Sequence, residues 1–155
     1  MSIPQFSAVN EDEKSLLLDA PVLVTYLIGG ADDNLDEKEK EKSGHLMHIR
    51  AATGDPILFD FYKEIENSFA IKLNGYVAKY GGLQANERTR VLVEELTKLN
   101  DILPKLSDIY ARAYLKSLRS LAHAIAEVSG GLLGFLDISY EEKHLTALEM
   151  ITYEP

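Results

Sequence analysis

The chain has 155 residues, no cysteine and a formal net charge of −9. Its length fits a single domain, and the missing cysteines exclude disulfides, thiolate metal sites and a cysteine nucleophile. The overall acidity argues against nucleic acid as a partner, because phosphate contacts need a dense cationic face, and favours metal cations or basic partners instead.

The N-terminal part predicts an arm followed by a very apolar helix. Residues 1–14 lack the basic stretch and apolar core of a signal peptide, and we interpret them as a flexible arm before a single domain over residues 15–155. The apolar run from Leu16 to Ile28 is shorter than the roughly 20 residues of a membrane span. We therefore expect a soluble, cytoplasmic protein whose first helix, over about residues 15–29, is central.

An acidic stretch follows this first helix. Gly30 is typical of a helix C-terminus. Asp36 can cap the next helix, with Glu39 at the capping-box spacing of three residues. Capping accounts for these two carboxylates but gives no role to Asp32 and Asp33. The stretch is therefore either a structural turn that ends one helix and begins the next, or a binding site for a cation.

Apolar positions spaced by three and four continue through most of the remaining chain. Asp55-Pro56, a cap followed by proline, predicts the start of a third helix. Pro104 predicts the boundary before a helix over about residues 105–129. A glycine-rich loop then leads into a last capped helix. The sequence thus predicts an all-α, compact single-domain bundle of about six helices.

Two segments of the chain share one pattern, in which an apolar helix ends in glycine, an acidic loop follows, and a capped helix begins. We interpret them as two pseudo-repeated helix–acidic turn–helix hairpins packed within one domain. The second copy has extra loop residues. The aligned positions are Leu35, Asp36 and Glu39 in the first copy and Ile138, Ser139 and Glu142 in the second.

These segments resemble the TerB family of tellurite-resistance proteins. In that family an apolar helix closes with alanine-aspartate-glycine, then come one residue, an aliphatic residue, a capping serine or aspartate, and a glutamate three further on. The segment Ala31 to Glu39 is similar, with Asp33 in place of the glycine, and residues 126–142 resemble the second copy, with Ser129 in place of the aspartate. The resemblance implies a compact all-α domain, a bacterial stress-response role, an acidic surface associated with metal binding, and no known catalytic reaction.

The candidate site is a group of carboxylates at the two acidic turns. Hard divalent cations such as calcium, magnesium and manganese prefer oxygen ligands, and both turns contribute to one patch if the hairpins pack side by side. An EF-hand is excluded, because the sixth position counted from Asp32 is Glu37 rather than glycine. The predicted ligands are Asp32, Asp33, Asp36, Glu39, Asp137, Glu141 and Glu142.

Two alternatives to a cation-binding module stay open. In the first alternative, the chain binds a protein partner of a stress-response complex without any metal. It would use either the uneven distribution of charge along the chain or the loop at 131–136. A metalloenzyme would instead use histidine and glutamate pairs such as Glu141 with His144, but a di-iron site needs two such pairs and two further glutamates. Phosphate-loop and nucleophile-elbow motifs are missing from the sequence, so we expect no enzyme activity. The remaining histidines are His45, His48 and His123.

Overall fold

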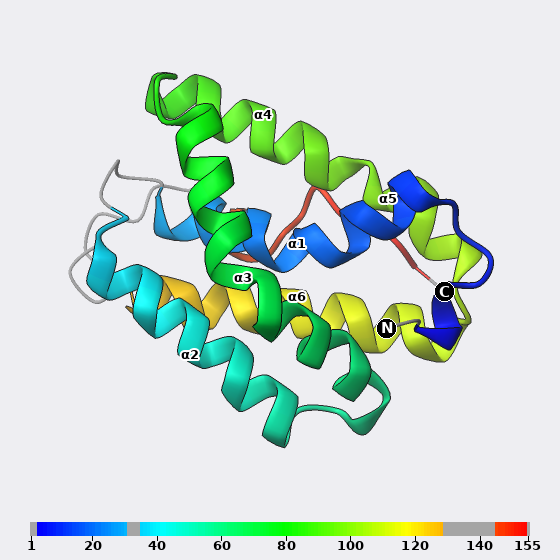
Figure 1. Cartoon of the computed structure of the whole chain (residues 1–155). Coiled ribbons are helices and arrows are strands. Elements are labelled where there is room, and N and C mark those ends of the chain that lie inside the picture. Colours follow the sequence, from blue (N-terminus) through cyan, green and yellow to red (C-terminus); the bar gives the residue numbers. More distant parts are fainter. Residues whose placement is uncertain (1–2, 31–34, 129–144, 155) are drawn as a thin grey trace.

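The computed structural model describes residues 3–30, 35–128 and 145–154, and this part of the chain is helical without strands (Figure 1). The predicted all-α bundle is confirmed, and the hairpin predicted to start again at Ser139 lies outside the described residues. The five longer helices in the described ranges are α1 (Glu11–Gly29), α2 (Glu37–Thr53), α3 (Phe59–Tyr80), α4 (Ala85–Thr97) and α6 (Asp108–Val128). Between them lie the short α5 (Leu99–Ile102) and the 3-10 turns η1 (Pro4–Phe6), η2 (Pro56–Leu58) and η3 (Leu103–Lys105).

Helix α1 is the central helix, as its apolar sequence predicts. It packs against α3, α4 and α6, and side chains around its whole circumference, such as Leu17, Val22 and Leu23, are buried. Helix α2 packs on α3 and α6 at the outside of the bundle. No helix of the described residues is long and apolar enough to cross a membrane.

The N-terminal residues differ from the flexible arm expected over residues 1–14. Phe6 of η1 is buried and packs edge-on against Tyr110 of α6. Helix α1 begins before residue 15 because Asn10 caps it: the Asn10 side chain accepts a hydrogen bond from the backbone N–H of Glu13, and the Glu13 side chain accepts one from the backbone N–H of Asn10. This capping box stands ahead of the apolar run, so apolar spacing alone places the helix start too late.

A tyrosine of α6 replaces the hydrogen bond that a proline inside α1 removes. Pro21 has no backbone N–H, so the carbonyl of Leu17, four residues earlier, lacks its usual helical donor. The hydroxyl of Tyr114 donates to this carbonyl at 2.6 Å, and both residues are buried. Burial raises the pKa of Tyr114 well above its ordinary value, so the hydroxyl keeps its proton. The contact explains how α1 carries a proline at the centre of the core.

An ion pair joins the start of α1 to η3. Lys105 Nζ donates to Glu13 Oε2 at 2.6 Å. This hydrogen bond is the largest cause that lowers the pKa of Glu13 below its ordinary value of 4.5, and the bond from the Asn10 backbone adds to it. The carboxylate form of Glu13 is therefore favoured by folding.

Acidification should remove this contribution to stability. The folded-state pKa of Glu13 lies below its unfolded value, so the contribution is fully present above the unfolded pKa and is lost as the pH falls through the folded pKa. Urea unfolding at about pH 7 and about pH 3 measures the change in the free energy of unfolding. Glu13→Gln keeps a capping side chain and should lose less stability on acidification than the natural chain. Equal losses in the two chains would contradict this account.

Candidate functional site

The start of α2 holds the two predicted ligands that the structure describes, Asp36 and Glu39. Asp36 is the N-cap of α2, and its Oδ1 accepts a hydrogen bond from the backbone N–H of Glu39 at 2.8 Å. The predicted cap is therefore confirmed. The other predicted ligands, Asp32, Asp33, Asp137, Glu141 and Glu142, lie outside the described residues.

Helices α1 and α6 end on the same side of the bundle. The two helices pack against each other, and Figure 1 shows that they run in the same direction, α1 in blue and α6 from yellow to orange, toward the side where α2 begins. A helix C-terminus carries partial negative charge and carbonyl oxygens without helical donors. At the end of α1 both features attract a cation, whereas the N-terminus of α2 on the same side carries partial positive charge.

A pocket of about 190 Å³ lies at the C-terminal end of α1. Two of its lining residues, Gly30 and Leu35, stand directly before and after residues 31–34 in the chain. The pocket is therefore next to the first acidic turn in the sequence. It is lined by Tyr26, Gly30, Leu35, Val77, Gly81 and Arg88.

Arg88 ties α4 to the end of α1 from within this pocket. Its side chain is only 4% exposed. Its Nη2 donates to the carbonyl of Gly30 at 2.6 Å, and its guanidinium lies 5.4 Å from the centre of the Tyr26 ring. The arginine thus fixes the carbonyl of Gly30, directly before residues 31–34, by a charge-assisted hydrogen bond.

The sequence contains a signal for Arg88, although this residue is not among the predicted site residues. Arginines usually lie at the protein surface, so Arg88 was not a candidate. However, it stands four residues before Leu92 and on the same helical stripe as Leu96, and both leucines are buried. A charged residue on the apolar stripe of a helix indicates a side chain that is buried and has a polar partner in the core.

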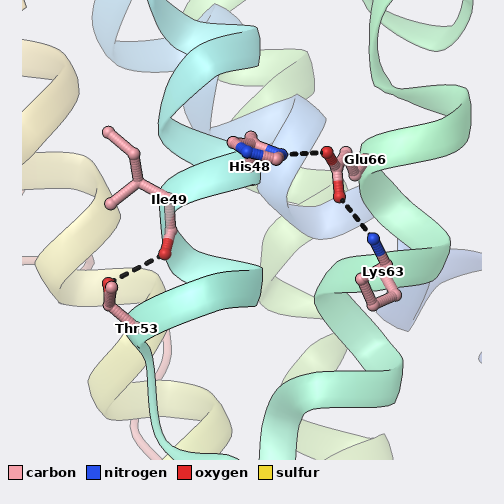
Figure 2. Close-up of polar contacts among 5 residues, drawn as sticks. All are labelled: His48, Ile49, Thr53, Lys63 and Glu66. Atoms are coloured by element: carbon pink, nitrogen blue, oxygen red, sulfur yellow. Dashed lines mark hydrogen bonds and ion pairs between the residues drawn. The ribbon is translucent and has the colours of Figure 1, made fainter.

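The histidines on α2 form a surface contact with α3. The rings of His45 and His48 stack with their centres 6.2 Å apart. His48 Nδ1 is hydrogen-bonded to Glu66, which also accepts from Lys63 at 3.3 Å (Figure 2). The bond from His48 is the largest cause that lowers the pKa of Glu66. The contact links α2 to α3 through one carboxylate, which is bonded to the imidazole of His48 and to the ammonium group of Lys63.

The described residues do not assemble the predicted histidine–glutamate metal site. His123 is exposed on α6, and no group of three or more histidine, aspartate and glutamate residues comes together within the described ranges as a metal ion would require. The pair Glu141 and His144 lies outside these ranges.

A scan against protein-family models, a search of curated proteins and a search of solved structures each found no match. The TerB-like assignment therefore stays a prediction that is based on the pattern of the two acidic turns.

Proposed function

We propose that the chain is a non-catalytic, TerB-like stress-response module that binds a divalent cation at its acidic end. The acidic end comprises the C-terminal ends of α1 and α6, the start of α2, and the acidic residues that follow α1 and α6 in the sequence. The observation that supports this proposal is the packing of α1 and α6 in the same direction, which brings the C-terminal end of α1 and the end of the described part of α6 to one side of the bundle. The end of α1 carries the negative end of its helix dipole.

The chemistry of this end suits a hard cation. Calcium, magnesium and manganese are held by carboxylate and carbonyl oxygens, and these are the groups that acidic residues and helix C-termini offer. The cap uses Oδ1 of Asp36, and a carboxylate can serve a cap and a cation through different oxygens. Asp32 and Asp33, which have no capping role, are the ligands we expect to matter most.

The two flanks of the first turn are fixed by the rest of the structure. Gly30 is held by the hydrogen bond from Arg88, and Asp36 is held as the cap of α2. Fixed ends reduce the conformational entropy that binding must overcome, because fewer backbone torsions remain to be ordered around the ion. This arrangement supports a site in which the turn, rather than a whole helix, responds to the cation.

Calcium or manganese should bind the metal-stripped chain saturably, and Asp32→Ala/Asp33→Ala should weaken binding by about tenfold or more, since the number of carboxylate ligands sets the affinity of such sites. Isothermal titration calorimetry measures both affinities. Asp60→Ala/Asp101→Ala is the matched control, because both aspartates are exposed on other helices, and it should bind like the natural chain. No saturable heat from either ion, with the helical circular dichroism signal intact, would refute the cation part of the proposal.

Protein interaction without metal is the second candidate function. It is favoured by residues 145–154, which the side chains of Asn100 and Arg119 hold through main-chain hydrogen bonds, as a bound peptide would be held. A histidine–glutamate metalloenzyme has no comparable support, because no three ligands meet within the described part of the chain.

A further inference from the structure

The C-terminal segment, residues 145–154, lies against the bundle (Figure 1, orange-red to red), and two of its apolar side chains are buried. Leu148 is completely buried and Ile151 is 1% exposed, three positions apart. The chain makes a turn between them, closed by a hydrogen bond from the N–H of Ile151 to the carbonyl of Leu148 at 3.0 Å. Leu148 has a φ of 51°, in the left-handed region that leucine rarely adopts. The contacts with the bundle therefore hold the segment in a conformation it would not favour alone.

Asn100 of α5 pairs with the main chain of this segment. Its Nδ2 donates to the carbonyl of Met150 at 2.9 Å, and its Oδ1 accepts from the N–H of Thr152 at 2.7 Å. The side-chain amide thus bonds main-chain groups on both sides of Ile151, much as a neighbouring strand would. Such pairing recognises a main-chain conformation rather than a particular side chain.

Two residues of α6 complete the contact. Arg119 donates through Nε to the carbonyl of Ala147 at 3.1 Å and through Nη2 to the carbonyl of Ile151 at 3.0 Å. Asp108 accepts from the hydroxyl of Tyr153 at 2.9 Å. We call Asn100, Asp108 and Arg119 the docking surface. It binds the segment mainly through carbonyl and amide groups, while Leu148 and Ile151 supply the apolar anchors.

We propose that the docking surface accepts residues 145–154 of a second copy of this chain in place of its own. The hydrogen bonds of Asn100, Asp108 and Arg119 join the segment to α5 and α6, and each could form in the same way with a segment from another molecule. Exchange of an identical element between copies is a low-cost route to a dimer, because no new interface has to be built. The segment shows directly which partner chemistry fits: two apolar residues three apart, with main-chain groups free to pair.

The natural chain should nevertheless be a monomer at micromolar concentration. A tethered segment has an effective concentration on the order of millimolar at its own binding site, and a segment from a second copy has to compete with it. Exchange becomes visible when the contact within one chain is blocked. Complementary variants of the full chain provide this condition.

Leu148→Asp/Ile151→Asp disables the segment and keeps the docking surface, whereas Asn100→Ala/Arg119→Ala disables the surface and keeps the segment. Each variant alone should be monomeric. An equimolar mixture at roughly 100 µM should form a 1:1 heterodimer in analytical ultracentrifugation. This concentration lies below the millimolar effective concentration of a tethered segment, so the natural chain should stay monomeric under the same conditions. The experiment is run with a metal chelator, so that its outcome is independent of the proposed cation. A mixture that stays monomeric while both variants keep their helical circular dichroism would overturn the proposal.

Hydrogen exchange on the natural chain tests the same idea without any substitution. A separable segment must detach by local opening while the helices stay folded. The amide of Thr152, protected by Asn100, should therefore exchange at least tenfold faster than the most protected amides of α6, since local openings are cheaper than global unfolding. Equal rates would mean that the segment leaves only when the whole chain unfolds, and would equally overturn the proposal.

Discussion

Tyr114→Phe should lower the free energy of unfolding by about 1–3 kcal/mol, the typical cost of leaving a buried polar group without its hydrogen bond. The substitution changes little in shape and removes only the hydroxyl that donates to the Leu17 carbonyl. That carbonyl has no helical donor, because residue 21 is proline. Urea unfolding monitored by circular dichroism measures the loss. Tyr153→Phe is the control, since its hydroxyl bonds to Asp108 in an exposed position, and it should change stability by less than about 0.5 kcal/mol.

A double-mutant cycle identifies the cause of that loss. Pro21→Ala restores an N–H four residues after Leu17, which can donate to the same carbonyl. In the Pro21→Ala background, Tyr114→Phe should therefore cost less than it does in the natural chain, with a coupling free energy of roughly 0.5–3 kcal/mol. Equal costs in the two backgrounds would mean that Tyr114 acts through packing alone and that the proline is compensated in some other way.

The caps of α2 and of the turn that leads into α3 were predicted from the sequence, whereas the capping box of Asn10 and Glu13 at the start of α1 was missed. Asp36 caps α2, and Asp55 caps the turn that leads into α3, because a cap acts on backbone groups within three residues. The break between α4 and α5 leaves no trace in the apolar spacing: Leu96 before it and Leu99 and Leu103 after it are all buried. Apolar spacing continues across a break of this kind, since the chain stays nearly helical, so the pattern gives no sign of it.

The contacts that shape the candidate sites could not be predicted in the same way. The bond from Arg88 to Gly30 joins residues 58 positions apart, and the bonds of Asn100 and Arg119 go to main-chain groups. A carbonyl or amide is present at every residue, so the sequence does not show which one a side chain will contact. The shared direction of α1 and α6 is likewise a result of tertiary packing, although the repeated pattern of the two turns had suggested that the hairpins lie together.

Gly30→Ala and Gly75→Ala should change stability in opposite directions although the chemical change is the same. A Cβ at Gly30 would lie 2.8 Å from the carbonyl oxygen of Tyr26 and 2.8 Å from Cδ1 of its ring, closer than side-chain atoms pack. Because one of these atoms belongs to the backbone, the end of α1 has to move, and we expect a loss of about 1–3 kcal/mol. Gly75 lies within α3 with no atom within 4 Å of an added Cβ, so alanine there should stabilise the chain by about 0.5–1 kcal/mol through helix propensity.

The same pair of variants connects the packing of α1 to the proposed cation site. Gly30 receives the hydrogen bond from Arg88 and directly precedes residues 31–34, so a displaced Gly30 should alter the geometry of the first acidic turn. Gly30→Ala should therefore weaken calcium or manganese binding, whereas Gly75→Ala, on α3, should leave it unchanged in isothermal titration. If the Gly30→Ala chain has the same free energy of unfolding as the natural chain, the Tyr26 ring and carbonyl can move away from the added Cβ without loss of stability. A destabilised chain with unchanged affinity would show that the acidic end binds its cation independently of how α1 ends.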